Sequence, residues 1–210
     1  MATPTARRSL ETRENSHHHS APLGRDRAGG FPDDDNPAGW QKAGALDATA
    51  VFVSGEWWRL VTALFLHADA SHVTSNALGG LLVFTATLST LGWLRGWVLV
   101  GLASIVGNLA VAAVNFPQPY VSVGASTAIF AGVGLLTGRA VRIAWRSSHP
   151  YRWRAMFVPL AAGLTVLALH GAGGQRVDVG AHLTGFLAGV FFGFAAGIPR
   201  KLANENSKTR

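Results

Sequence analysis

Long stretches without a charged residue constrain this chain more than any other feature of its sequence. No Asp, Glu, Lys or Arg occurs in residues 77–94, 96–138 or 155–175. Apolar runs of about 20 residues are long enough to cross the hydrocarbon core of a bilayer as a helix. Only 14% of all residues are charged and 49% are hydrophobic, whereas soluble domains average about 25% charged residues. The sequence therefore predicts an all-α polytopic membrane protein.

Five membrane spans are predicted, separated by short segments rich in Gly, Pro or Asn. They cover, approximately, residues 72–92, 96–114, 124–143, 155–171 and 179–198. Tryptophans lie near the span ends, as is typical of a membrane–water interface. Around these spans we expect a disordered polar N-terminal tail (1–44), a membrane domain (45–198) and a basic C-terminal tail (199–210).

The basic residues indicate how the spans are oriented. One side of the five spans carries ten Lys and Arg residues and a single acid, Glu205. The opposite side has an uncharged loop at 115–123, and its last connection carries Arg176 and Asp178. Because Lys and Arg accumulate in cytoplasmic loops, the first side is expected to be cytoplasmic and the N-terminal tail external. The net charge of +7 then reflects topology in the cell membrane rather than nucleic-acid binding.

Four polar residues suited to acyl-transfer chemistry lie at the starts of predicted spans. His72 and Asn76 open the first span, Ser126 the third and His182 the fifth. All three spans begin on the non-cytoplasmic side, so these residues lie within about two helical turns of that surface. Ionisable groups inside a membrane are costly and mark functional sites. Since histidine is the usual base for a serine nucleophile, the sequence predicts a Ser–His dyad that opens to the non-cytoplasmic side.

The same residues also have a structural interpretation. The Gly124-x-Ser126 pattern is typical of closely packed membrane helices. Gly185 and Gly189 share the helix face of His182, where another helix can approach. Close approach of the third and fifth spans would bring Ser126 to His182, so packing and catalysis are compatible.

His72 and Asn76 lie four residues apart, on one face of the first span. They are either a polar helix start or, in the functional interpretation, an oxyanion hole. In that case the Asn76 amide, the His72 imidazole and the Ser126 backbone N–H would meet the negative charge that develops on a carbonyl oxygen. His67, outside the span, is expected to shape a water-filled entrance.

Metal-dependent and cofactor-dependent chemistry is not expected. His67-x4-His72 lacks the spacing and the glutamate of a zinc-protease motif, and the chain has no Cys. No acid is placed to complete a triad, because Asp178 lies four residues before His182 in a predicted loop.

As a set, these residues resemble the rhomboid intramembrane serine proteases. The matching segments are Trp58-Arg59, His67-x4-His72-x3-Asn76, Gly124-x-Ser126 with Phe130, and Ala181-His182-x2-Gly185-x3-Gly189. The resemblance covers about residues 45–198 and implies a six-helix fold. It implies Ser126 as the nucleophile, His182 as the general base, and Phe130 packed on the His182 ring. Asn76 and His72 would stabilise the oxyanion. The Trp58-Arg59 loop would lie at the outer membrane surface, and the substrates would be membrane-anchored proteins cut in or near a transmembrane helix.

Two features depart from the family pattern, and both concern the scaffold rather than the dyad. Residues 1–50 contain no apolar stretch of spanning length, so the usual first span is missing. Leu88 and Ser89 stand where a glutamate is expected late in the span at 72–92. One alternative is therefore a non-catalytic rhomboid-like protein that binds transmembrane helices for quality control. A small transporter or channel is the other, but it predicts polar residues at the membrane midplane, where this chain has few.

Overall fold

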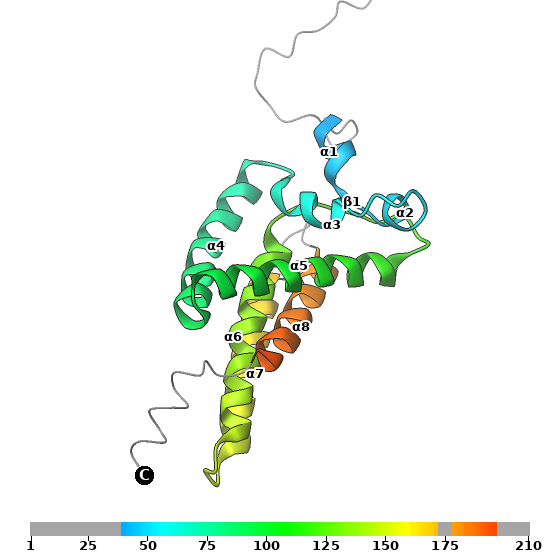
Figure 1. The fold of residues 1–210 in the computed structure, drawn as a ribbon. Helices are drawn as coiled ribbons and strands as arrows, with labels where there is room; N and C mark the ends of the chain where they lie inside the picture. Colours follow the sequence, from blue (N-terminus) through cyan, green and yellow to red (C-terminus); the bar gives the residue numbers. More distant parts are fainter. Residues whose placement is uncertain (1–38, 172–177, 197–210) are drawn as a thin grey trace, which may run out of the picture. The chain divides into compact units, whose positions relative to one another are not determined.

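Five long helices form the bundle that carries the candidate site (Figure 1). The structure is a computed structural model that describes residues 39–171 and 178–196. The long helices are α4 (Ala70–Leu91), α5 (Trp93–Asn115), α6 (Ser126–Arg146), α7 (Arg152–Gly171) and α8 (Val179–Ala195). Each falls on one of the five segments predicted as spans, so a mainly helical fold is confirmed for the described part of the chain.

The number of spans is not confirmed in the same way. Within the described residues, only α5 and α6 are both long and apolar enough to cross a membrane, and α8 is a shorter apolar helix of 17 residues. Ser and Thr residues make α4 more polar, and two arginines open α7. The predicted count of five spans is therefore not confirmed.

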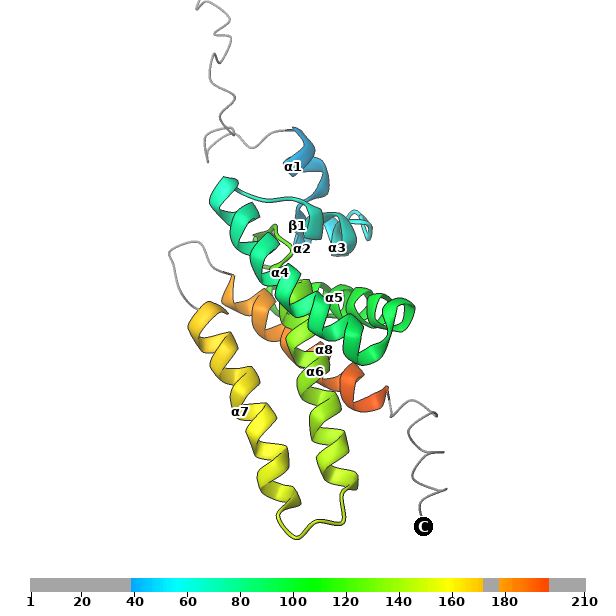
Figure 2. The same ribbon diagram turned by 90° about the vertical axis from the view of Figure 1, so that its left-hand side faces the viewer.

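The contact between α6 and α8 is the most extensive interhelical contact, and α5 also packs on α8. Glycines make this approach possible. Gly134 and Gly138 of α6 face the backbone of α8, while Gly189 and Gly193 of α8 face the backbone of α6. Membrane helices commonly use small residues in this way to bring their backbones into contact. Figure 2 shows α6 and α7 side by side, and the two helices are in contact.

Large apolar side chains are exposed on the outside of the bundle. Leu82 of α4 is 73% exposed and Val114 of α5 is 81% exposed, and many other large apolar residues are exposed on the described helices. Soluble monomers rarely expose contiguous apolar surface on this scale. Such a surface is suited to contact with lipid.

Short elements before α4 form a hydrogen-bonded layer whose apolar residues pack in a hydrophobic core. They are α1 (Gly39–Gly44), β1 (Leu46–Asp47), α2 (Ala48–Phe52), α3 (Arg59–Thr62) and the 3-10 helix η1 (Ala63–Phe65). β1 pairs antiparallel with β2 (Val121–Ser122), which precedes α6. This pairing attaches the layer to the chain segment that leads into Ser126.

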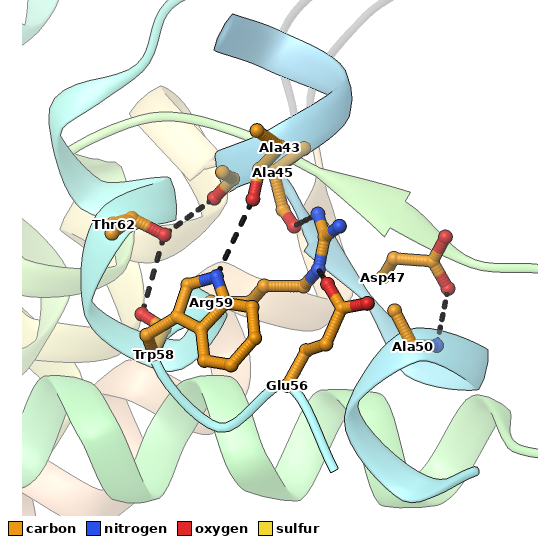
Figure 3. A network of polar contacts seen from close by, with 9 residues as sticks. Ala43, Ala45, Asp47, Ala50, Glu56, Trp58, Arg59 and Thr62 are labelled. Atoms are coloured by element: carbon orange, nitrogen blue, oxygen red, sulfur yellow. Dashed lines mark hydrogen bonds and ion pairs between the residues drawn. The ribbon is translucent and has the colours of Figure 1, made fainter. Parts of the chain in front are cut away.

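Arg59 is the centre of this layer, as Figure 3 shows. Its buried guanidinium group donates hydrogen bonds to Glu56 (Nε to Oε2, 2.6 Å) and to the carbonyl oxygen of Ala45 (2.8 Å). Thr62 donates to the Gly44 carbonyl oxygen at 2.7 Å. A buried charge is tolerated only when it is paired and hydrogen-bonded, so the Trp58-Arg59 segment is a structural brace for the layer.

The predicted tails are only partly described. α1 occupies the last six residues of the segment expected to be a disordered N-terminal tail, where Gln41 donates a hydrogen bond to the His67 carbonyl oxygen. The prediction relied on local composition, which does not reveal contacts with residues distant in the sequence. Residues 1–38 and the predicted basic tail at 199–210 lie outside the described residues.

Candidate active site

The start of α4 positions two of the predicted site residues. Asp69 is the N-cap, and its carboxylate accepts a hydrogen bond from the His72 backbone N–H at 2.8 Å. The Ser71 hydroxyl, followed by that N–H, lowers the pKa of Asp69 by hydrogen bonding and keeps the cap charged. An aspartate cap fixes the first turn of a helix. It thereby fixes His72 and, one turn further along, Asn76, whose side chain is only 8% exposed.

Gly124 brings these two side chains against the segment that leads into α6. A methyl group on Gly124 would lie 2.7 Å from both Cε1 and Nε2 of His72 and 3.5 Å from Nδ2 of Asn76. The φ of Gly124 is +132°, a backbone conformation that favours glycine. His72 and Asn76 therefore face the backbone two residues before Ser126, and Gly124 is required there by both space and conformation.

The Asn76 amide is a buried donor whose Nδ2 has no acceptor among the described residues. Leaving such a donor unsatisfied costs roughly 1–3 kcal/mol. Native proteins keep few of these groups, and each one calls for an explanation. A donor in this position is available to an oxygen atom that arrives beside Gly124.

Ser126 and His182 come from α6 and α8. Ser126 is the first residue of α6 and is half-buried, whereas His182 lies in the first turn of α8 and is 6% exposed. The rings of Phe130 and His182 pack together, with centroids 4.5 Å apart and an interplanar angle of 32°. Ser126 and Phe130 are four residues apart and share a helix face. The structure thus brings His182 to the face of α6 that begins with Ser126.

Three helices meet one turn from these residues. A methyl group on Gly185 of α8 would lie 2.5 Å from the carbonyl oxygen of Thr127 in α6. From α5, a methyl group on Gly107 would lie 2.8 Å from Cα of Gly185. The packing interpretation of Gly185 is therefore correct, and this contact also holds the helix that carries His182 against the helix that carries Ser126.

Asp178 and Tyr120 support the start of α8, and sequence reasoning did not assign them this role. The Asp178 carboxylate is the N-cap and accepts the Ala181 N–H at 2.9 Å, while its carbonyl oxygen accepts the His182 N–H at 3.1 Å. The Tyr120 hydroxyl also donates to this carboxylate. Burial, reinforced by the carboxylate, raises the pKa of Tyr120, so the hydroxyl keeps its proton. An acid directly before a helix is a recognisable capping signal, whereas nothing local to Tyr120 indicates its partner 58 residues away.

His67 lies beside His72 rather than apart from the site. The two imidazole rings form an edge-to-face pair with centroids 5.1 Å apart. Burial and then the charge of His72 lower the pKa of His67, which favours its neutral form. No group of three His, Cys, Asp or Glu side chains suited to a metal ion is found in the described part of the chain.

Comparison with known proteins identifies the family. The Rhomboid domain matches residues 54–198. The chain is 31% identical over 159 residues to RHOMBOID-like protein 1 of Arabidopsis thaliana, covering 73% of this chain and 38% of that protein. It is 30% identical over 152 residues to Rhomboid protease GluP of Bacillus subtilis (strain 168), covering 72% of this chain and 28% of that protein. Rhomboid-like protease 3 of Toxoplasma gondii is 37% identical over 150 residues, which cover 70% of this chain and 54% of that protein.

The matched region thus spans about a quarter to a half of the length of these curated relatives. The family match itself covers most of the present chain, including every residue of the candidate site. The chain therefore belongs to the rhomboid family of membrane proteins.

Proposed function

We propose that this protein is an intramembrane serine endopeptidase that cleaves membrane-anchored proteins in or near their transmembrane helices. One observation carries the proposal. His72 and Asn76 pack against Gly124, just before Ser126, while the His182 ring packs on Phe130, one turn after Ser126. Residues from α4 and α8 thus pack beside the first turn of α6.

In the proposed reaction, His182 takes the hydroxyl proton of Ser126 as the serine oxygen attacks the scissile carbonyl carbon. The protonated imidazole then gives this proton to the departing amine, and an acyl-enzyme ester remains on Ser126. A water molecule, deprotonated by His182, attacks the ester and releases the new carboxyl end. This division of one difficult hydrolysis into two easier steps is the general advantage of a covalent nucleophile.

The oxyanion formed at each step needs preorganised donors. The buried Nδ2 of Asn76 and the imidazole of His72 supply them in this proposal, together with the backbone N–H of Ser126. The packing of both side chains on Gly124 supports the assignment, because it holds the donors beside the segment from which the nucleophile emerges.

We place the site toward the non-cytoplasmic face of the cell membrane, as the distribution of Lys and Arg indicates. Trp57, Trp58 and Phe65, in the layer before α4, are exposed, and aromatic residues of this kind suit a membrane–water interface. A substrate helix keeps its carbonyl groups in backbone hydrogen bonds. Residues that disfavour helix near the scissile bond should therefore promote cleavage.

The direct test uses the purified full chain, reconstituted in liposomes with a panel of single-pass membrane proteins. Cleavage products whose new ends map to the transmembrane segment or its border support the proposal. A protein that binds these substrates and leaves them uncut would instead be the non-catalytic helix-binding relative.

Replacing Asn76 by alanine is expected to lower kcat by roughly 10–1000-fold, the range for loss of one oxyanion donor. The KM should change little, because the amide acts mainly on the transition state. Asn115→Ala is the matched control, since its amide bonds the Val111 carbonyl oxygen within α5. An Asn76→Ala protein with the same kcat as the wild type would remove Asn76 from the mechanism.

Replacing Tyr120 by phenylalanine is expected to destabilise the domain by about 1.5–3 kcal/mol, the usual value of a hydrogen bond to a charged group. The change removes only the hydroxyl that Asp178 accepts, so the α8 N-cap loses one support while the ring remains. Unfolding in detergent, followed by circular dichroism, measures the effect. Tyr151→Phe, at the exposed start of α7, is the control, and equal stability of both variants would contradict the role of Tyr120.

A further inference from the structure

A second candidate site lies at the other end of α6 from Ser126. Arg139, Arg142 and Arg146 recur at intervals of three and four residues, which places them along one side of the helix. A cavity of about 250 Å³ opens here between the end of α6 and the end of α8. Its lining residues are Arg142, Trp145, Arg146 and Phe194.

The walls of this cavity are held in place by contacts between the two helices. Arg142 donates from Nη1 to the Phe194 carbonyl oxygen at 2.7 Å, and its guanidinium carbon lies 5.5 Å from the centre of the Phe194 ring. The ring of Trp145 packs on the same phenylalanine with centroids 5.1 Å apart. Arg95 of α5 donates to the Ala196 carbonyl oxygen at the end of α8. The cavity thus lies between two helix ends that contact each other, and the exposed side chains of Trp145 and Arg146 form its open side.

These contacts leave some of the arginine N–H donors without an acceptor among the described residues. The Nε atoms of Arg139 and Arg142 are buried and have no acceptor among the residues that the structure describes. Arg146 is exposed at the rim. Cationic donors left unpaired in this way are expensive, and they are best satisfied by an anion that accepts several hydrogen bonds at once.

Protein carboxylates do not supply that anion in the described structure. The ion pair between Arg59 and Glu56 is the only one found among the described residues. The sequence holds no Asp or Glu from residue 70 to residue 177. The guanidinium groups of Arg142 and Arg146 therefore line the cavity with no acidic side chain on α6 or α7.

We propose that this cavity, lined by Arg142, Trp145, Arg146 and Phe194, binds the phosphate headgroup of an anionic phospholipid. Basic pockets between membrane helices, at the level of the headgroups, are suited to such lipids. The volume is below the range of pockets for drug-sized ligands, which fits a headgroup whose acyl chains remain outside. Exposed apolar residues beside the rim, such as Ile143, offer a surface for those chains, which a free phosphate ion would not use.

A bound headgroup would join the ends of α6 and α8 that lie away from Ser126 and His182. It would oppose separation of the two helices through the same contact that Gly134, Gly138 and Gly193 make along their length. The lipid site does not depend on catalysis, so its test is independent of the test of the proposed protease activity.

The test measures lipid binding to the purified full chain in a neutral detergent by native mass spectrometry. Phosphatidylglycerol and phosphatidylcholine are titrated separately, and inorganic phosphate is added as a competitor in a third series. We expect one saturable phosphatidylglycerol site, with clearly weaker binding of phosphatidylcholine. Arg146→Gln should weaken phosphatidylglycerol binding about fivefold, the effect of one basic residue near anionic lipid. Arg146 makes no hydrogen bond that the fold requires, so this variant should remain folded.

Arg154→Gln is the matched control, because it removes the same charge from the neighbouring α7 outside the cavity. It should change the affinity less than twofold. Equal weakening by both substitutions would overturn the proposal in favour of diffuse surface attraction. Displacement of the lipid by inorganic phosphate at a similar concentration would also overturn it, since the site would then bind a free anion. The absence of saturable phosphatidylglycerol binding would also overturn the proposal.

Discussion

Ser126→Ala and His182→Ala are each expected to lower proteolysis by about 10⁴- to 10⁶-fold, the loss seen when one member of a nucleophile–base pair is removed. Ser126 is half-buried at the first position of α6, and alanine is smaller than serine and favours helix. The alanine variant should therefore insert and unfold like the wild type. The readout is the rate of substrate cleavage in liposomes.

The two substitutions should also be non-additive. Nucleophile and base act as one unit, so the double variant is expected to be no slower than either single variant. Ser89→Ala is the matched control, because the Ser89 hydroxyl is exposed and bonds only carbonyl oxygens of its own helix. Cleavage by Ser126→Ala at the wild-type rate would contradict the assignment of the nucleophile.

Gly185→Ala is expected to reduce both stability and activity. The added methyl group would lie 2.5 Å from the Thr127 carbonyl oxygen and 3.0 Å from its Cγ2 atom. The carbonyl oxygen belongs to the backbone, so α6 and α8 must separate to accommodate it. Overpacking of this kind costs typically about 1–3 kcal/mol. The separation also moves His182 away from the face that begins with Ser126, so a loss of activity should exceed what unfolding alone explains.

Two measurements distinguish these effects. Unfolding in a titration of denaturing detergent gives the stability, and kcat at a temperature where both proteins are folded gives the activity. Gly101→Ala in α5 is the matched control, because a methyl group there meets nothing within 4 Å. If Gly185→Ala left both quantities unchanged, close packing of α6 on α8 would not be what positions His182.

The long helices could be predicted because each carries its signal within its own sequence. The segment predicted at 72–92 is the helix Ala70–Leu91, and the segment predicted at 124–143 is the helix Ser126–Arg146. The contact between the third and fifth of these helices was expected from Gly185 and Gly189, and both of these α8 glycines pack against the backbone of α6. The predicted number of membrane spans is not confirmed, because only α5 and α6 among the described helices are both long and apolar enough to cross a membrane.

The short elements could not be predicted, because pairings distant in sequence create them. The strand Leu46–Asp47 is two residues long and exists through its pairing with Val121–Ser122. Asp178 was predicted to lie in a loop and to be no triad member, whereas the structure shows that it also caps α8 and accepts a hydrogen bond from the Tyr120 hydroxyl. Such roles depend on which segments meet in space, and local composition carries no information about that.

The central claim is that His182 activates Ser126 for covalent catalysis, and labelling with a serine-directed fluorophosphonate tests it most directly. The purified wild type is treated with the probe, and peptide mass spectrometry locates the label. We predict modification at Ser126 alone in the wild type, much weaker labelling in His182→Ala and no labelling in Ser126→Ala. Labelling that persists in Ser126→Ala, or a wild type that is cleavage-competent but labelled at another serine, would contradict the claim.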